Sequence, residues 1–329
     1  MKWNSRKVLV TGAGGFIASH LTERLVLEGA QVRAFVRYNS RNDYGLLKFL
    51  SPKAKAEVEI IAGDLRDAEA VRLAAESTDT VFHLGALIAI PYSYLHPREV
   101  VETNIMGTLN VLIAARHWGV RRVVHTSTSE VYGTAKYVPI DEQHPLQGQS
   151  PYSASKIGAD KLAESFCRSF ESAISTVRPF NTYGPRQSAR AIIPTIITQA
   201  LTREFVHLGS LTPTRDFTFV ADTVDGFLRA ATVDAAIGQE INLGCGATIS
   251  IGDLAYKIFS LLGKDPKIVT DTQRLRPEKS EVMKLFASNE KAQQLLGWQP
   301  QVSLGEGLKE TIEWISNHLE LYDPDIYSV

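Results

Sequence analysis

Near its amino terminus the chain reads Lys7-Val8-Leu9-Val10-Thr11-Gly12-Ala13-Gly14-Gly15-Phe16-Ile17-Ala18-Ser19-His20-Leu21, and this stretch decides the fold. The apolar run that starts at Lys7 is typical of a buried strand, and the glycines after it let backbone N–H groups approach a pyrophosphate. The helix that follows presents its N-terminus to that negative charge. Strand, glycines and helix in this order predict an α/β dinucleotide-binding fold with a doubly wound parallel sheet. Ala18 replaces the third glycine of the stricter pattern and is small enough for close packing.

The loop after the expected second strand, 31–36, bears on which dinucleotide is bound. NAD-selective sites usually place an acid there, which accepts hydrogen bonds from the ribose 2′-hydroxyl. This chain has Val36 followed by Arg37. With no carboxylate to repel a phosphate, and with Arg37 and Arg41 able to grip one, the loop favours NADP over NAD. The alternative, that both arginines are merely solvated, leaves NAD open.

Two further strand ends are expected to contact the cofactor. After a strand over 58–62, Asp64 and Leu65 are placed to hydrogen-bond and sandwich an adenine. After a strand over 80–84, small residues form a turn that lets the nicotinamide half lie close to the backbone, while His83 is expected to pack in the strand rather than act as a base. The candidate cofactor contacts are Gly12, Gly14, Gly15, Phe16, Ile17, Arg37, Asp64, Leu65, Leu84, Ala86 and Pro179, together with the Tyr152 and Lys156 discussed next.

A polar segment supplies an acid/base pair. The chain reads Ser150-Pro151-Tyr152-Ser153-Ala154-Ser155-Lys156, in which Ser150 is expected to cap a helix and Pro151 to be its first residue. Tyr152 and Lys156 are four residues apart, so a helix places both on one face. There the Lys156 ammonium can lower the pKa of the Tyr152 phenol and hold a cofactor ribose.

A second reactive group follows the strand expected over 122–126. Thr128, Ser129 and Glu130 come directly after it, and open α/β sheets bind ligands at the carboxyl ends of their strands. We therefore expect these three residues to meet the Tyr152–Lys156 pair at one edge of the sheet. Asn104, on a helix expected over 97–118, is expected to tie down a neighbouring backbone rather than to meet substrate.

Candidate substrate contacts come after the strand expected over 174–178, where the alternation of strands and helices becomes irregular. They are Asn181 and three loop arginines, Arg186, Arg215 and Arg276. Arginines that face one site can clamp a diphosphate through paired hydrogen bonds. The alternative is that they are ordinary solvated loop residues.

Composition excludes several classes of function. The chain has 329 residues, 44% hydrophobic and 22% charged, which suits one large domain or two small ones with a sizeable core. A net charge of -1 without runs of Lys or Arg argues against nucleic acid and membrane surfaces as partners. No apolar stretch reaches the roughly 18 residues of a membrane span. Cys167 and Cys245 lack metal-ligand spacing, so they predict neither a metal site nor a disulfide but small buried side chains in a reducing compartment. Because Met1 to Val8 contain no apolar signal segment, we expect a cytoplasmic location.

Taken together, these motifs resemble the extended short-chain dehydrogenase/reductases that act on nucleotide sugars, the NAD-dependent epimerase/dehydratase family. The resemblance runs from the glycine motif through Tyr152 and Lys156 to Arg276-Pro277 and Leu296-Gly297-Trp298. It implies a Rossmann domain with tightly bound NAD or NADP and a smaller C-terminal α/β domain for the nucleoside-diphosphate sugar. It also implies a homodimer packed through the helices at about 97–118 and 151–170.

The two expected domains interleave along the chain. Residues 1–178 plus about 219–245 are assigned to the Rossmann domain, because a helix over 220–232 and a strand over 240–243 are expected to return to the sheet. About 179–218 plus 246–329 are assigned to the nucleotide-sugar domain, which closes with an amphipathic helix over 303–319.

Within the family, Thr128-Ser129-Glu130 resembles the sequence of 4,6-dehydratases, in which the glutamate is the base at C5 and Tyr152, assisted by Thr128, serves the oxidation at C4. Many dehydratases have Asp at the Ser129 position, whereas the GDP-mannose 4,6-dehydratase branch and UDP-glucuronate decarboxylases have Ser. The closest resemblance is to dehydratases of legionaminic-acid-type pathways. It implies GDP- or UDP-N-acetylglucosamine, or GDP-mannose, as substrate.

Three alternatives stay open at this point. A 4-epimerase and a UDP-glucuronate decarboxylase share the oxidation at C4. A cofactor-sensing binding protein without catalysis is the third, and it predicts the loss of Tyr152, Lys156 or Thr128, all of which are present.

Overall fold

The computed structural model describes residues 3–271 and 282–322 and contains a seven-stranded, fully parallel sheet. The strands, in their order across the sheet, are β3 Glu59–Gly63, β2 Gln31–Arg37, β1 Lys7–Thr11, β4 Thr80–His83, β5 Arg122–Thr126, β6 Ile174–Pro179 and β11 Glu240–Leu243. The order reverses between β1 and β4, which is the switch point where doubly wound sheets bind their ligands. The predicted Rossmann-type α/β fold is confirmed.

Helices cover both faces of the sheet. One face is packed by α1 Phe16–Leu27 and α9 Val220–Thr232, and the other by α3 Ala68–Ala74, α6 Gly107–His117 and α7 Pro151–Phe170. Side chains alternate along a strand, so Val8 and Val10 of β1 enter the first core while Leu9 enters the second. This double burial explains why the strands read as continuous apolar runs.

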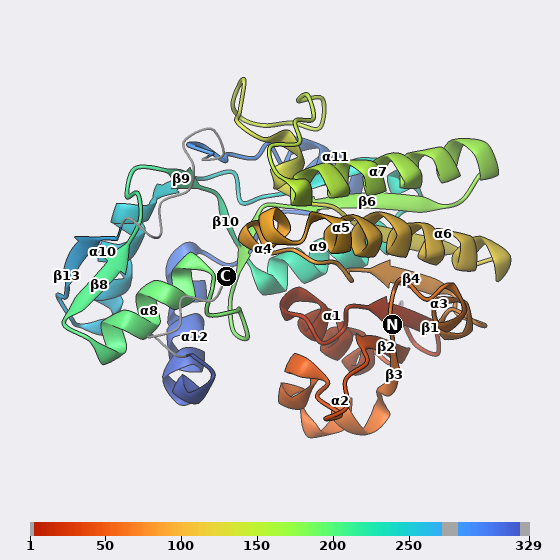
Figure 1. Cartoon of the computed structure of the whole chain (residues 1–329), viewed down its shortest axis with the longest axis horizontal. Coiled ribbons are helices and arrows are strands. Elements are labelled where there is room, and N and C mark those ends of the chain that lie inside the picture. Colours follow the sequence, from red (N-terminus) through yellow and green to blue (C-terminus); the bar gives the residue numbers. More distant parts are fainter. Residues whose placement is uncertain (1–2, 272–281, 323–329) are drawn as a thin grey trace.

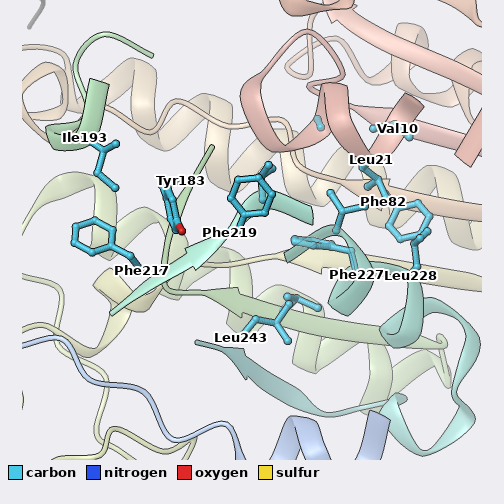
Figure 2. Close-up of a cluster of buried hydrophobic side chains, with 14 of the residues drawn as sticks. Val10, Leu21, Phe82, Tyr183, Ile193, Phe217, Phe219, Phe227, Leu228 and Leu243 are labelled. Carbon is cyan, nitrogen blue, oxygen red and sulfur yellow. The ribbon is translucent and has the colours of Figure 1, made fainter. Parts of the chain in front are cut away.

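Most of the remaining elements gather to one side of the sheet in Figure 1. They include α8 Ile192–Thr202, α10 Ile251–Leu262 and α12 Leu304–Asn317, and three strand pairs: β7 Asn181–Tyr183 with β10 Phe217–Phe219, β8 Phe205–Leu208 with β13 Lys267–Thr270, and β9 Thr214–Arg215 with β12 Ile249–Ser250. The helix α11 Glu290–Leu296 instead packs against β11 and α9. Figure 2 shows that the first core runs on from Phe82 and Leu21 through Phe227 to Tyr183 and Phe217, so sheet and side elements share one hydrophobic cluster.

Short helical elements complete the described chain. They are η1 Gly45–Phe49, α2 Pro52–Glu57, α4 Ile90–Leu95, η3 Ser129–Tyr132, η4 Asp234–Ala236 and η7 Leu319–Leu321. None of the helices in the described residues is both long and apolar enough to cross a membrane.

The helix expected over 97–118 is interrupted. It consists of α5 Pro97–Val101, one π-helical turn η2 Glu102–Met106, and α6. Asn104 lies in the π turn, and its side-chain amide bonds both backbone groups of Leu87. The Leu87 N–H donates to Asn104 Oδ1 at 2.8 Å, and Asn104 Nδ2 donates to the Leu87 carbonyl at 2.9 Å. Nδ2 also reaches Ser155 Oγ at 2.9 Å. The predicted backbone tie is confirmed, and π turns of this kind are frequent at functional sites.

The start of α7 is fixed as the sequence predicts. Ser150 is the N-cap, its Oγ accepts from the Ser153 N–H at 3.1 Å, and Ser153 Oγ accepts from the Ser150 N–H at 2.9 Å. Pro151 is the first helical residue. This reciprocal cap makes the first turn of α7 rigid where Tyr152 needs a defined orientation.

Candidate active site

The predicted acid/base pair lies on one buried face of α7. Tyr152 is 7% exposed and Lys156 3% exposed. Asp160, one further turn along, lies on the same face and is 4% exposed. The face packs towards the ends of β5 and β6, next to η3. The site is therefore largely desolvated before any ligand binds.

The environment of Tyr152 differs from the expectation. Burial raises the pKa of its phenol, a hydrogen bond with Thr128 acts in the opposite direction, and the charges of Glu130 and Asp160 raise it further. Lys156 is not among the groups that shift this pKa, and desolvation is the largest cause. The prediction of a lowered phenol pKa is thus wrong for the protein by itself, because both members of the pair are buried.

The ammonium of Lys156 is buried and lacks a hydrogen-bond acceptor among the described residues. Burial lowers the pKa of its ammonium to about 8, and the negative charge of Asp160 acts against this shift. In the described part of the chain, no group accepts a hydrogen bond from Lys156 Nζ. An ammonium with unused donors is suited to hold ribose hydroxyls, and this role of Lys156 stays a prediction.

Thr128, Ser129 and Glu130 lie where β5 ends. Thr128 is the N-cap of the 3₁₀ helix η3, and its Oγ1 accepts from the Glu130 N–H at 3.2 Å. Ser129 is buried, whereas Glu130 is partly exposed. Thr128 thus contacts both the phenol of Tyr152 and the backbone of Glu130. The two reactive groups predicted from the sequence are brought together.

The glycine loop is shaped by its neighbours. Gly12 has φ +68°, and a Cβ there would lie 2.6 Å from the Cα of Gly85, which follows β4. A Cβ on Gly14 would lie 2.8 Å from the carbonyl oxygen of Tyr44. The need for glycine at these positions therefore comes from the close approach of other backbone segments as well as from any phosphate.

The N-terminus of α1 fits a pyrophosphate. Its N-cap, Gly15, provides no side-chain hydrogen bond, and no acid stands in the first turn, where Phe16 and Ile17 lie. The first amides of the helix are thus available to an anion. At the adenine side, Asp64 accepts hydrogen bonds from Arg66, which hold the pKa of its carboxyl low, and Leu65 packs beneath Gly85.

The turn after β4 is the one predicted to lie beside the nicotinamide. Leu84 and Ala86 are partly buried there, and Pro179 ends β6, two strands across the sheet from β4. His83 is packed, as expected: its Nδ1 lies 2.7 Å from Thr11 Oγ1 and its Nε2 3.0 Å from Thr108 Oγ1. Burial keeps the pKa of His83 well below its usual value.

Arg37, on which the NADP prediction rests, lies exposed at the end of β2. Its Nη2 is 3.4 Å from Glu99 Oε1 of α5. A single long contact to an exposed guanidinium is weak, so Arg37 can turn to a ribose phosphate.

The predicted substrate arginines differ in their surroundings. Arg186 is buried: its Nη2 donates to Glu23 Oε2 of α1 at 2.6 Å and to the Phe49 carbonyl at 3.0 Å, and its guanidinium stacks over Trp314. This engagement fastens the 184–186 loop to α1, and a role in clamping diphosphate stays a prediction. Arg215 lies on β9, Asn181 Nδ2 donates to the Asp216 carbonyl at 3.4 Å, and Arg276 lies outside the described residues.

A buried polar cluster, which we call the Arg178 network, lies below the site and does not follow from any motif in the sequence. The sequence contains only two weak indications of this cluster. One is Asp160, an acid one helical turn after Lys156, and the other is the presence of polar residues at the ends of apolar strands. The members of the network are His125, Ser127, Tyr132, Asp160, Arg178 and Asn242.

The chain as a whole is similar to known proteins of two activities. The family model described as GDP-mannose 4,6 dehydratase matches residues 9–311. A UDP-glucose 4-epimerase of Mycolicibacterium smegmatis is 34% identical over 317 residues, covering 94% of this chain and 99% of the relative. A dTDP-D-glucose 4,6-dehydratase of Mus musculus is 32% identical over 321 residues, covering 94% and 88%. The structure of a dTDP-glucose 4,6-dehydratase from Streptomyces venezuelae with NAD bound is similar, with a TM-score of 0.84 and 29% identity over 97% of this chain and 99% of that one.

The burial of Lys156 leads to a stability prediction. Lowering its pKa from 10.5 to about 8 corresponds to roughly 3 kcal/mol lost by the folded state, at 1.36 kcal/mol per pKa unit. Below pH 8 Lys156 is charged in both the folded and the unfolded protein, so the folded state bears the full loss of stability. The loss becomes smaller as the pH rises from about 8 to 10.5, because the folded protein then holds Lys156 in its neutral form. We expect Lys156→Met, in protein stripped of nucleotide, to raise the free energy of unfolding in urea by an amount that is largest below pH 8.

Lys161→Met is the matched control, because Lys161 is an exposed residue of the same helix. It should change the free energy of unfolding by less than about 0.5 kcal/mol at every pH. A Lys156→Met protein less stable than the wild type at pH 7, or a gain independent of pH, contradicts the assignment.

Proposed function

The chain belongs to the GDP-mannose 4,6-dehydratase family of extended short-chain dehydrogenase/reductases, and from this premise we propose that it is a nucleotide-sugar 4,6-dehydratase. It would convert a nucleoside-diphosphate hexose into the 4-keto-6-deoxy sugar. GDP- or UDP-N-acetylglucosamine, or GDP-mannose, is the proposed substrate. That the chain is an enzyme of the dehydratase and epimerase group follows from its relatives; the dehydration itself is the proposal.

One observation supports it: the charge of Glu130 acts on the phenol of Tyr152. The carboxylate is near enough for its charge to raise the pKa of the phenol, and Thr128 contacts both residues. A dehydration needs a base at C5 beside the group that deprotonates O4, whereas oxidation at C4 needs the phenol alone. The partly exposed Glu130 supplies that second base.

In this reaction the phenolate form of Tyr152, assisted by Thr128, takes the proton from O4 of the sugar. A bound nicotinamide would supply the hydride chemistry, accepting hydride from C4 and returning it to C6. The resulting ketone acidifies the C5 hydrogen, which Glu130 removes. Glu130, or a water held by Ser129, then protonates the departing 6-hydroxyl, which leaves as water. A proton from solvent adds to C5 when C6 receives hydride. Lys156 holds the ribose and keeps a positive charge beside the phenolate, which is otherwise costly at a buried site.

The alternative is a 4-epimerase, and the 34% identical relative of that activity favours it. Epimerisation would use Tyr152 and Lys156, but it includes no removal of the C5 hydrogen and so would not need Glu130 as a base. A decarboxylase shares the first oxidation and would need a cation at the C6 carboxylate, which Arg215 is one candidate to provide.

For the cofactor we propose NADP, with NAD as the alternative, held tightly. The absence of an acid after Val36 and the exposure of Arg37 support NADP. The NAD found with the Streptomyces venezuelae relative supports the alternative.

The remaining proposals concern assembly. Residues 1–178 plus about 219–245 are proposed to hold the cofactor, and about 179–218 plus 246–329 the sugar nucleotide. Exposed apolar side chains support a homodimer through α5 to α7; they are Val101, Met106, Ile113 and Phe170. The cytoplasmic location expected from composition belongs to the same proposal.

The products test the function directly. With a panel of nucleotide sugars in deuterated water, we expect a product lighter by one water, with deuterium at C5, read by mass spectrometry and NMR. A product of unchanged mass with inverted C4 would establish the epimerase, and loss of carbon dioxide the decarboxylase.

Glu130→Gln should separate the two half-reactions. The amide keeps the shape but is no base, so oxidation at C4 should persist while loss of water slows by ~10²–10⁴. The near-ultraviolet absorbance of reduced nicotinamide should then rise when substrate is added. Tyr152→Phe serves as control, because it should bind cofactor yet show no such rise. Wild-type elimination in Glu130→Gln would remove the main support for a dehydratase.

The nucleotide released by denaturing the purified protein should be NADP. Arg37→Ala should lower the NADP content relative to NAD, because the guanidinium supplies part of the phosphate contact. If the wild type releases only NAD, Arg37 and Arg41 are solvated loop residues.

A further inference from the structure

The Arg178 network connects two catalytic elements, and its first end is the helix α7. Asp160 Oδ1 accepts from His125 Nε2 at 3.0 Å, and Oδ2 accepts from Ser127 Oγ at 2.7 Å and from Arg178 Nε and Nη2 at 3.2 and 3.0 Å. These contacts keep the pKa of the Asp160 carboxyl low in spite of its burial. The ionised carboxylate anchors the helix one turn after Lys156.

The second end is η3. The remaining nitrogen of the same guanidinium, Arg178 Nη1, donates to Tyr132 Oη at 3.0 Å, and Tyr132 Oη donates to Asn242 Oδ1 at 2.7 Å. Tyr132 is the last residue of η3, the short helix that carries Ser129 and Glu130. Each nitrogen of the Arg178 side chain is thus used, and the contacts divide between α7 and η3.

Arg178 itself is fixed by the sheet. It is 2% exposed, lies in β6 and is paired in register with Asn242 of β11. A planar guanidinium that donates from several nitrogens defines orientation as well as distance. Arg178 therefore acts as a rigid spacer between two elements that the backbone joins only through a long polar loop.

We infer that Arg178 is a positioning residue for this reaction: it holds the element bearing Glu130 in register with the helix bearing Tyr152 and Lys156. The inference rests on the proposed function, in which Tyr152 serves C4 and Glu130 serves C5 of one bound sugar. Relaxing the link at Tyr132, the end of η3, displaces Glu130. Ser127 Oγ still donates to Asp160 Oδ2, which holds the Thr128 end of η3 and leaves the Tyr152–Lys156 pair in place. The step that suffers is the elimination.

The alternative, that the network only stabilises the fold, is weak on physical grounds. Burying an ion pair brings little net stability, and apolar residues of similar volume often serve as well. Removing one ion of such a pair leaves the other uncompensated and can prevent folding. The test therefore changes a hydroxyl and leaves Asp160 and Arg178 intact.

The variant is Tyr132→Phe, which removes only the link from Arg178 to η3 and its onward bond to Asn242. We expect KM and the rate of nicotinamide reduction to stay within about threefold of wild type. Loss of water and deuterium uptake at C5 should slow on the order of tenfold to a hundredfold, as misplacement by about 1 Å does. Transient reduced nicotinamide should accumulate.

Tyr183→Phe is the matched control. Tyr183 is equally buried, and its hydroxyl donates to the Leu304 carbonyl at 3.3 Å, outside the Arg178 network. It should leave both half-reactions unchanged. If Tyr132→Phe slows oxidation and elimination alike, or is indistinguishable from Tyr183→Phe, the inference is overturned.

Amide hydrogen exchange of the cofactor-bound protein judges the positioning without reference to the reaction. Tyr132→Phe should raise exchange in residues 127–133 and leave the start of α7 protected, while Tyr183→Phe should change neither. Unchanged exchange at 127–133 overturns the inference even if the enzyme is a dehydratase. Raised exchange in a protein that proves to be an epimerase upholds the positioning and refutes only the proposed function.

Discussion

The ion pair between Asp160 and Arg178 is the interaction on which the site depends. Both groups are almost fully buried, and each is satisfied by further hydrogen bonds that reach β5, η3 and β11. A carboxylate and a guanidinium removed from water tolerate little displacement, because any lost contact exposes an uncompensated charge. The pair therefore fixes α7 against β6, and with it the place of Tyr152 and Lys156 at the edge of the sheet.

The same burial disfavours the charged forms of the catalytic residues. Desolvation raises the pKa of Tyr152 and lowers that of Lys156, so each group is pushed towards its neutral form. A phenolate and an ammonium formed together would offset one another, and a bound cofactor would bring the ribose hydroxyls that Lys156 can hold. Such a site lowers the stability of the fold in return for reactivity, which is common where function requires a charged group that is shielded from water.

Carboxylates fasten the C-terminal segments in a related way, with backbone N–H groups as donors. Asp216 accepts from Cys245, Gly246 and Ala287, and Asp222 accepts from Gln301 and Val302. Segments distant in the chain are thereby tied to β10 and α9, next to the core that Figure 2 displays. The parts of the molecule expected to hold substrate are thus joined to the sheet by buried polar contacts as well as by apolar packing.

The helices, the strands and the Tyr152–Lys156 pair could be predicted from the sequence, because they follow local rules of period, caps and spacing. The glycine turn after β1, the cap at Ser150, the shared face of Tyr152 and Lys156 and the backbone tie of Asn104 could all be predicted in this way. Only the tertiary structure decided the partners of buried charges. Arg186 pairs with Glu23, which is 163 positions away in the sequence, and Arg178 contacts Tyr132, which is 46 positions away. No local pattern encodes such pairs, since they form when strands and helices far apart in the chain pack together.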